Sequence, residues 1–304
     1  MSNYRAGFVG LIGQPNAGKS SVLNFLVKEK VAIVTPKPQT TRRRVLGIVS
    51  QDEGQIVLVD APGMVKAAKG INAFLQAEME SVIQSSDALI AVLPIDEKAV
   101  DKVNEIIDIV KESKKPWIAL ITKTDIKEKV HRIDILKSML SDFNVPTLTI
   151  STVKGKGVDR DTLLEAIRII LPAAPEPLYP DVELFTPHHV RDLVSEIIRE
   201  QCFENLYQEV PYGVAVRILK FEEPAEKKIY KIYAEILASK ESFKPIIVGK
   251  EAAVIKKIGT AARLEIEKLV GEKVFLDLQV KVKENWNENK KLLKELGYDA
   301  NDVE

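Results

Sequence analysis

The chain has 304 residues, of which 45% are hydrophobic, enough for two separately cored domains and too many for one small domain. Its 44 basic and 44 acidic side chains cancel, which excludes a uniformly basic nucleic-acid-binding protein but allows a local basic face. The single cysteine, Cys202, excludes an internal disulfide and suits a reducing compartment; we expect it in the apolar face of a helix.

No segment predicts passage through a membrane. The chain begins M-S-N-Y-R-A-G, without the charged start and long apolar core of a signal peptide. No apolar run approaches the roughly 18 residues that a spanning helix needs. The sequence therefore predicts a soluble, cytoplasmic protein.

Short apolar runs alternate with amphipathic stretches through the first half of the chain. The runs, each ending at a polar loop, cover residues 7–12, 55–59, 88–93, 117–122 and 146–150. Amphipathic patterns over residues 100–111 and 133–140 predict helices between them. The alternation predicts an α/β fold with a mostly parallel sheet covered on both faces. Ligands of such folds bind at the carboxyl ends of the strands, where these loops fall.

The first of these loops has the pattern of a phosphate-binding loop. Residues 13–20 read G-Q-P-N-A-G-K-S and fit G-x-x-x-x-G-K-[ST], between an expected strand (8–12) and an expected helix (21–27). Its backbone N–H groups and the helix N-terminus would surround phosphate oxygens, with Lys19 on the β- and γ-phosphates and Ser20 on Mg²⁺. A chance match in a glycine-rich turn is the alternative. The expected nucleotide contacts here are Gly13, Gln14, Pro15, Asn16, Ala17, Gly18, Lys19, Ser20 and Ser21.

A second loop, D-A-P-G over residues 60–63, follows the next apolar run. Asp60 is placed to hold Mg²⁺ through water, and the Gly63 N–H to meet the γ-phosphate; D-x-x-G alone is a common turn, but its position after a P-loop strengthens the prediction. Many switch GTPases place a water-orienting glutamine directly after this glycine. Met64 cannot do this, so we expect slow intrinsic turnover. The expected nucleotide contacts here are Asp60, Ala61, Pro62, Gly63 and Met64.

Between these loops, residues 38–44 read P-Q-T-T-R-R-R. A threonine here can complete the Mg²⁺ shell while the γ-phosphate is present and release it after hydrolysis, which is the order–disorder switch of GTPases. We assign this role to Thr41, which stands immediately before an arginine, with Thr40 as the alternative. The metal ligands are then Ser20, Thr41 and Asp60. The arginine run could face RNA or be an ordinary solvated surface.

Two further loops would read the base. Thr122-Lys-Thr-Asp125 resembles N-K-x-D, with Thr122 in place of the usual asparagine and the Lys123 stem expected over the base. The Asp125 carboxylate can accept from two guanine donors that adenine lacks; at roughly 1.5–3 kcal/mol each, these bonds give on the order of a hundredfold discrimination or more. A structural turn is the alternative for both loops. The residues concerned are Thr122, Lys123, Thr124 and Asp125, then Ser151, Thr152 and Val153 at the position of an S-A-[KE] loop.

Five prolines between residues 171 and 187 predict a stiff, extended connector. After it the pattern changes to helix (189–203), strands (213–221 and 229–238), helix (254–269) and strand (274–282), a small α+β unit. We therefore expect domains at residues 1–172 and 187–286, a linker at 173–186, and a polar, partly disordered tail at 287–304.

These motifs together carry a family resemblance. To them the second half adds V-R-D-L-V-S-E-I-I-R-E-Q-C-F-E-N-L-x-x-E-V-P-Y over residues 190–212 and V-G-K-x-x-x-x-I-K-K-I-G over residues 248–259. Over nearly its whole length the chain resembles the bacterial Era GTPases. The resemblance implies a type II KH domain, binding of small-subunit (16S) ribosomal RNA near its 3′ end, a role in assembling the 30S subunit, and some contact with the inner membrane. A monomer is expected.

The resemblance also bears on hydrolysis. In related GTPases an asparagine at the position of Asn16 helps to hold a K⁺ ion that acts like an arginine finger. The candidate catalytic residues are therefore Asn16, Lys19, Thr41 and Gly63, with GTP or GDP, Mg²⁺ and K⁺ as cofactors.

The expected RNA clamp departs from the family pattern. KH domains hold single-stranded RNA with a G-x-x-G loop, but here the loop reads G-K-E-A (249–252), with alanine in place of the second glycine and an acid beside it. Basic side chains gather nearby, yet residues 181–304 hold 20 basic and 23 acidic residues, so we expect unpaired bases in an apolar groove rather than simple charge attraction. An ordinary helix cap with weak RNA affinity is the alternative. The expected RNA contacts are Gly249, Lys250, Glu251, Ala252, Lys256 and Lys257, and the expected groove is Ile247, Val248, Ile255 and Ile258.

Three other functions fit parts of the sequence. One is a different P-loop enzyme, such as an ATPase or a small-molecule kinase, which Asp125 argues against. Another is an RNA-binding assembly protein that uses nucleotide only structurally. The third is a GTPase whose altered KH domain binds protein instead of RNA.

Overall fold

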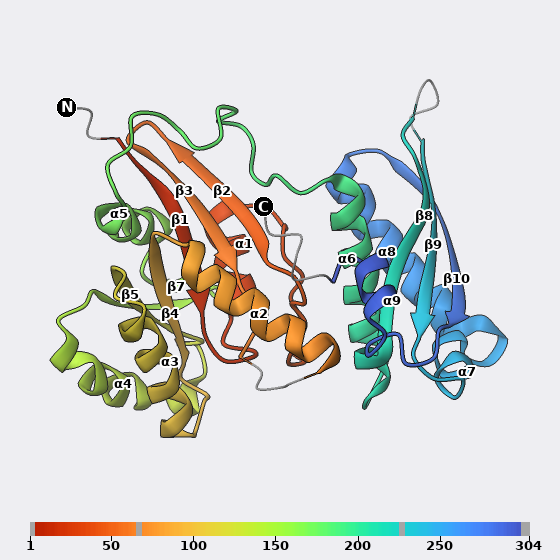
Figure 1. Cartoon of the computed structure of the whole chain (residues 1–304), viewed down its shortest axis with the longest axis horizontal. Coiled ribbons are helices and arrows are strands. Elements are labelled where there is room, and N and C mark those ends of the chain that lie inside the picture. Colours follow the sequence, from red (N-terminus) through yellow and green to blue (C-terminus); the bar gives the residue numbers. More distant parts are fainter. Residues whose placement is uncertain (1–3, 65–68, 225–228, 299–304) are drawn as a thin grey trace. The chain divides into compact units, whose positions relative to one another are not determined.

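The structure is a computed structural model that describes residues 4–64, 69–224 and 229–298. The chain divides into two compact units (Figure 1). The first holds most of the chain up to Pro187. The second begins at His188 and also includes two short segments, Ile33–Thr40 and the described residues 69–74.

The first unit is built on a seven-stranded sheet with the order β2-β3-β1-β4-β5-β6-β7. Strands β2 and β7 run antiparallel to their neighbours and the other pairs are parallel, so the predicted mostly parallel sheet is confirmed. The sequence prediction missed β2 and β7, the two edge strands. The strands are β1 (Arg5–Ile12), β2 (Val45–Gln51), β3 (Gly54–Asp60), β4 (Ala88–Pro94), β5 (Trp117–Thr122), β6 (Thr147–Ser151) and β7 (Lys156–Gly157).

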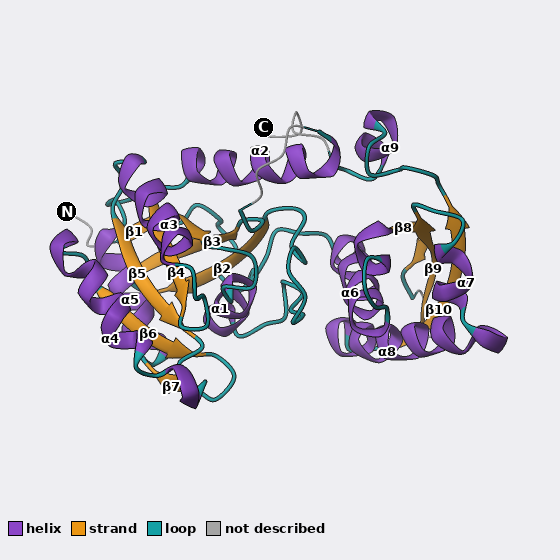
Figure 2. Ribbon diagram, turned by 90° about the horizontal axis from the view of Figure 1, so that it is seen from below, coloured by secondary structure: helices purple, strands orange, loops and turns teal. Residues whose placement is uncertain are grey.

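Helices cover both faces of this sheet (Figure 2). Alternate side chains of β4 enter two separate cores: Ile90 and Val92 pack beneath α1 and α5, and Leu89 and Leu93 beneath α2, α3 and α4. The helices at residues 100–111 and 133–140 are confirmed, while α2 and α5 were not predicted. The helices are α1 (Lys19–Val27), α2 (Gly70–Ser85), α3 (Val100–Glu112), α4 (Arg132–Leu140) and α5 (Arg160–Ile170).

Strand β1 lies at the point where the order of the strands in the sheet reverses. It pairs with β3 on one side and with β4 on the other, so later strands are added on both sides of it. Ligands of open α/β sheets bind at the carboxyl end of such a strand. That end is Ile12, directly before the predicted phosphate-binding loop.

The proline-rich segment packs along the first unit instead of spanning free space. The Ile48 N–H donates to the carbonyl of Phe185 at 2.8 Å, and the Thr186 hydroxyl donates to the carbonyl of Leu46 at 2.7 Å. The Gln55 amide bonds both backbone groups of Tyr179. These bonds satisfy polar groups near the β2 edge of the sheet, which explains why an extended segment follows it.

The second unit is a three-stranded sheet, β10-β9-β8, with helices against it (Figure 2). Strand β8 is antiparallel and β10 parallel to β9, and α6 and α8 pack on each other and on the sheet. Cys202 is fully buried in α6, as predicted. The elements are α6 (Val190–Asn205), β8 (Val214–Glu222), β9 (Ile229–Ala238), α7 (Phe243–Val248), α8 (Ala253–Val270), β10 (Lys273–Val282) and α9 (Lys290–Glu295).

The tail that was expected to be partly disordered is ordered at residues 287–298. This stretch forms α9, with Leu293, Leu296 and Tyr298 buried. It follows Trp286, which is fully buried and donates its indole N–H to the carbonyl of Gly213 at 2.9 Å. A few apolar side chains among many charges therefore anchor the segment. Residues 299–304 lie outside the described part.

No helix among the described residues is long and apolar enough to cross a membrane.

Candidate active site

The loop after β1 curls around its own lysine. Gly18 adopts a left-handed conformation (φ 96°), and α1 begins at Lys19. Lys19 is only 6% exposed, and its ammonium donates to the carbonyls of Gly13 at 3.0 Å and Gln14 at 3.1 Å. Burial lowers the pKa of Lys19, and the nearby Asp60 carboxylate opposes that shift. A partly desolvated cation therefore lies inside a loop that opens a helix, an arrangement suited to anions.

Three oxygen-bearing side chains meet beside this lysine. The Ser20 hydroxyl donates to Asp60 Oδ2 at 2.5 Å, and the Thr41 hydroxyl lies 3.1 Å from Ser20 Oγ and 3.3 Å from Asp60 Oδ2. Thr40 instead bonds locally, to Thr35 Oγ1 at 2.7 Å and the carbonyl of Lys37 at 2.8 Å. Of the two threonines that the sequence left open, the structure brings Thr41 to Ser20 and Asp60.

The Asp60 carboxylate has the features of a cation ligand. It is fully buried, and burial raises its pKa, while Lys19, Ser20 and Thr41 oppose the shift. Its Oδ1 atom is buried without a hydrogen-bond partner among the described residues. An unpaired buried carboxylate oxygen beside two hydroxyls is an all-oxygen set of the kind that Mg²⁺ prefers. The described residues contain no group of three or more His, Cys, Asp or Glu side chains placed for a metal.

Gly63 allows the loop at residues 60–64 to pack directly against the phosphate-binding loop. A Cβ atom there would come within 2.8–2.9 Å of Pro15 atoms, so only glycine allows this approach. Ala61 and Pro62 are buried beside it, and Met64 is half-buried against the core beneath α2, α3 and α4. The loop at residues 60–64 therefore lies directly on the phosphate-binding loop.

The two base-reading loops are joined by hydrogen bonds. The Ser151 hydroxyl donates to Asp125 Oδ1 at 2.7 Å, and this bond is the main cause that lowers the pKa of Asp125. The Thr122 hydroxyl donates to the carbonyl of Ala17 at 2.7 Å, which ties the end of β5 to the phosphate-binding loop. Threonine in place of asparagine therefore still connects these loops. Ser21, Thr124 and Thr152 are half-buried, Asn16 is exposed, and Val153 is 83% exposed.

Two residues at this site were missed from the sequence. Asp96 Oδ2 lies 2.8 Å from the Lys123 ammonium and holds that side chain in place. Glu105 of α3 accepts from the Gln14 amide at 3.3 Å. The only sequence signal for Asp96 is its place just after β4, at the same edge of the sheet as the other loops.

The residues just before Thr41 belong to the second unit. The Val34 N–H donates to Glu200 Oε1 at 2.9 Å, and the Lys37 ammonium donates to the carbonyls of Phe203 and Leu206. The boundary between the two units therefore falls between Thr40 and Thr41, inside the predicted switch.

The arginine run after Thr41 is not the exposed surface that either sequence interpretation assumed. Arg42 is only 4% exposed, and the Arg44 N–H donates to Glu78 Oε2 of α2 at 3.2 Å.

The predicted RNA loop keeps a glycine-like shape without its second glycine. Gly249 (φ 74°), Glu251 (φ 53°) and Ala252 (φ 61°) all lie at positive φ. Lys250 and Lys257 are exposed, and the Lys256 ammonium donates to the carbonyl of Glu251 at 3.3 Å.

The expected apolar groove needs correction. Ile247 and Ile258 are fully buried in the core of the second unit, because both face inward from their helices. A hollow of about 260 Å³ instead lies beside α8 and β10. Its lining residues are Ile255, Lys256, Gly259, Thr260, Arg263, Leu276 and Leu278.

Comparison with known proteins agrees with this geometry. Residues 8–123 match the family described as 50S ribosome-binding GTPase, and residues 209–287 match the KH domain family. GTPase Era of Geobacter metallireducens is 39% identical over 97% of this chain and 98% of its own length. GTPase Era of Caldicellulosiruptor saccharolyticus is 38% identical over 99% of both chains.

The chain belongs to the Era GTPase family. Solved Era structures match the fold over 97% of this chain and 99% of their own. One is a single-residue variant of Aquifex aeolicus Era bound to GDP·AlF₄⁻, at 30% identity and a TM-score of 0.89. Another is Era in complex with MgGDPNP and nucleotides 1506–1542 of 16S ribosomal RNA, at 31% identity and a TM-score of 0.90.

Membership of the family makes the chain a GTPase with a KH domain. Family membership therefore excludes three of the alternatives that the sequence left open: an ATPase, a small-molecule kinase and a non-catalytic RNA-binding protein. The role of each residue in the site stays a prediction.

Substitution of the two threonines separates their roles. We expect Thr41→Ala to lower Mg²⁺-dependent GTP hydrolysis by about 10- to 100-fold, the usual cost of losing a group beside a metal. Thr40→Ala is the matched control and should stay within a few-fold of the parent, because the hydrogen bonds of Thr40 to described residues lie within its own loop. Single-turnover hydrolysis measures both; a larger loss in Thr40→Ala would reverse the assignment.

Proposed function

We propose that this Era-family GTPase binds small-subunit (16S) ribosomal RNA through its second unit and assists assembly of the 30S subunit. The observation that carries the proposal is the hollow beside α8, which combines apolar walls with cations. An Era structure at 31% identity holds a 16S fragment, which supports the same partner class here.

The hollow suits unstacked bases. Ile255, Leu276 and Leu278 offer apolar contact, and Gly259 has no side chain to fill the space. Lys256 and Arg263 stand beside it; Arg263 also pairs with Glu267 at 2.9 Å, so its charge is partly balanced. Recognition therefore depends more on base contact than on charge, in keeping with the acidic balance of this half of the chain.

The clamp loop supports the same partner despite Ala252. At φ 61° the alanine takes the left-handed shape of the missing glycine, at a cost of roughly 1–2 kcal/mol. The surrounding fold would keep the loop in this conformation. The methyl group of Ala252 would leave less space for an RNA phosphate beside the loop than glycine does.

RNA affinity tests the proposal. We expect Lys256→Ala to weaken binding of a single-stranded 16S fragment and to reduce the log–log salt slope by about 0.7, the contribution of one phosphate contact. Ala252→Gly should tighten binding, because it relieves backbone strain and opens the loop. Lys268→Ala, on the same helix but outside the hollow, is the control. If neither Lys256→Ala nor Ala252→Gly changes the affinity, the loop is not the clamp, and a KH unit that binds protein partners becomes the favoured alternative.

The site residues fit GTP chemistry in the same proposal. Bound Mg²⁺ supplies charge neutralisation at the phosphate oxygens. Ser20, Thr41 and Asp60 would hold it; Lys19 would exchange its loop carbonyls for phosphate oxygens. Asp125 would accept from guanine, and Asp96 would keep the Lys123 stem over the base.

The site has no glutamine after Gly63 to orient the attacking water. Met64 has no group that can orient a water molecule, so intrinsic turnover is expected to be slow. The chain is proposed to act as a monomer in the cytoplasm, with peripheral contact at the inner membrane, as the family resemblance implies.

Monovalent cations test the proposed role of Asn16. If a K⁺ ion bound near Asn16 stabilises charge at the phosphates, hydrolysis should be several-fold faster in KCl than in NaCl at equal ionic strength. Asn16→Ala should abolish that difference while its rate in NaCl stays near that of the parent. Equal parent rates in the two salts would rule out the K⁺ role.

A further inference from the structure

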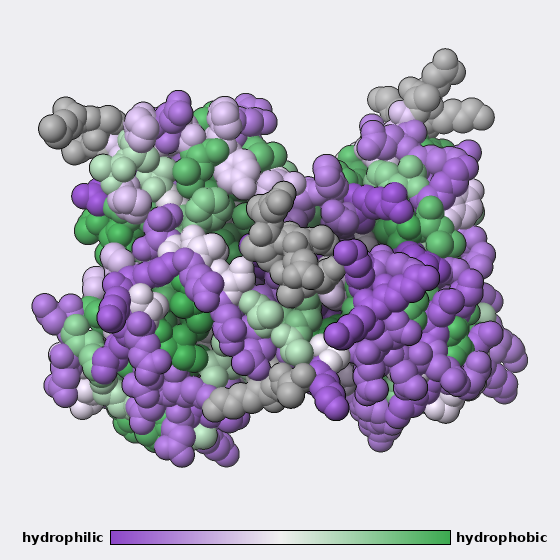
Figure 3. All heavy atoms as spheres, viewed as in Figure 1, coloured by the Kyte–Doolittle hydropathy of each residue, from purple (hydrophilic) through white to green (hydrophobic). Residues whose placement is uncertain are grey.

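A groove runs between α2 and α3 of the first unit, with a volume of about 730 Å³. Its floor is apolar: Met79 is buried, and Met64, Ile83 and Ile109 are half-buried against the core below. In Figure 3, green side chains lie between purple ones over these two helices.

The rim of the groove is acidic. Carboxylates follow one face of α3 at a spacing of four, three and four residues, which places like charges next to one another. Such neighbours destabilise a helix by a few tenths of a kcal/mol per pair, so folding alone gives no reason for them. The acidic residues are Glu80 on α2 and Asp101, Glu105, Asp108 and Glu112 on α3.

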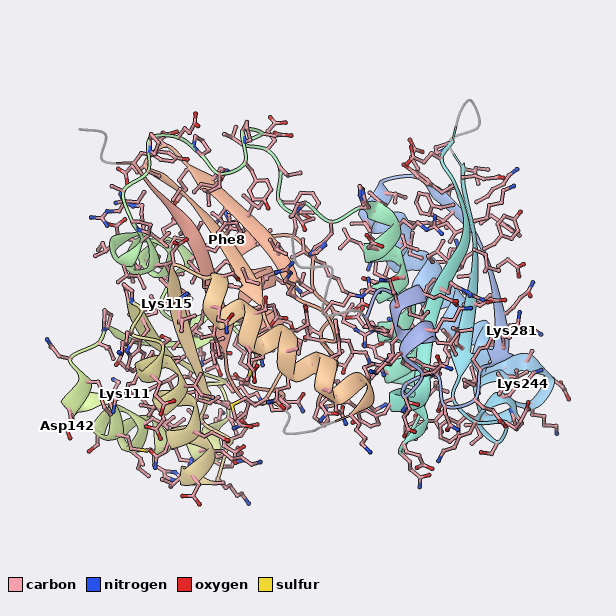
Figure 4. The ribbon with its side chains drawn as sticks, in the orientation of Figure 1. Phe8, Lys111, Lys115, Asp142, Lys244 and Lys281 are labelled. Carbon is pink, nitrogen blue, oxygen red and sulfur yellow. The ribbon has the colours of Figure 1, made fainter. Side chains whose placement is uncertain are left out.

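No ion pair among the described residues joins a cation to Glu80, Asp101, Asp108 or Glu112. Lys102, the only basic residue that lines the groove in the described part of the chain, pairs with Glu97 at 3.7 Å. Lys111 lies over the Phe143 ring, 4.7 Å from its centroid, and Lys115 donates to the carbonyls of Gln84 and Ser86 (Figure 4). A partner would therefore meet an apolar floor beside these four carboxylates.

The groove adjoins the nucleotide site at two points. Met64, which directly follows Gly63, forms part of its wall. Glu105 lines it and accepts from the Gln14 amide of the phosphate-binding loop at 3.3 Å. A molecule in the groove would thus touch the residue in place of the water-orienting glutamine and a residue bonded to the phosphate loop.

We propose that the α2–α3 groove docks a basic amphipathic helix of a protein partner, and that its occupancy changes the rate of GTP hydrolysis. Apolar side chains of the helix would fill the floor, and lysines or arginines on its flanks would pair with the carboxylates. The acidic rim extends over about 16 Å of α3, from Asp101 to Glu112, so about three turns of partner helix match it. The same carboxylates repel phosphate, which disfavours RNA here.

The first test measures, by fluorescence anisotropy, the binding of two synthetic helical peptides to the full chain with GDP bound. Both have 14 residues and a leucine face; one carries lysines on its flanks and the other glutamates. We expect the parent to bind the lysine peptide at least tenfold tighter, and less tightly as salt rises. The double variant D108K/E112K should reverse the order of the two peptides.

The control is D134K/D142K, which makes the same change in net charge at α4 and beyond its end, outside the groove (Figure 4). It should keep the parent order of the peptides. If both double variants change binding alike, the attraction is only net charge and the groove proposal fails. Ile109→Ala should also weaken binding of the lysine peptide, because the substitution removes part of the apolar floor. Unchanged binding would equally overturn the proposal.

Hydrogen exchange and hydrolysis complete the test. The lysine peptide should protect the backbone of α2 and α3 from hydrogen exchange. Protection by a single-stranded RNA 12-mer instead would assign the groove to nucleic acid and overturn the proposal.

Saturating lysine peptide should change single-turnover GTP hydrolysis at least threefold in the parent. It should leave D108K/E112K unaffected, and the basal rate of that variant should equal the parent's. Binding with no change in parent hydrolysis would contradict the proposed coupling.

Discussion

The proposed chemistry of this protein depends on one buried carboxylate. Asp60 is withdrawn from water beside Lys19, Ser20 and Thr41, and one of its oxygens has no hydrogen-bond partner among the described residues. A buried charge that is only partly satisfied is costly to the folded chain, so the site is arranged for binding rather than for stability. In the proposed site, the ammonium and the two hydroxyls would hold the carboxylate in place for Mg²⁺.

The sheet explains why these residues meet. β1, β3, β4 and β5 end at the same edge, and β1 lies where the order of strands reverses. The phosphate-binding loop, the loop that begins at Asp60, Asp96 and the loop at Thr122 follow these four strands. Direct hydrogen bonds then tie the loops together, from Thr122 to Ala17 and from Lys123 to Asp96. A rigid scaffold with short loops keeps the site in register.

Local patterns in the sequence predicted most of the fold. Continuous apolar runs predicted the buried strands β1, β3, β4 and β5, because strands covered on both faces have few polar positions. The same pattern also predicted β6, which is only partly buried. The same approach missed β2 at the sheet edge, and it expected partial disorder in the tail that contains α9 because that tail is rich in polar residues. It also placed Ile247 and Ile258 in the RNA groove, since apolar type alone does not tell inward from outward. The contact of Asp96 with Lys123 and the α2–α3 groove arise from tertiary packing, which one sequence does not display.

Magnesium dependence of nucleotide binding tests the central role of Asp60 most directly. GTP affinity would be measured with Mg²⁺ and with EDTA, for the parent and for Asp60→Asn, which keeps the size of the side chain but removes its charge. The account predicts that Mg²⁺ tightens GTP binding to the parent by about tenfold or more and has little effect on the variant, while the two proteins bind GTP similarly in EDTA. An equal gain from Mg²⁺ in both proteins would contradict it.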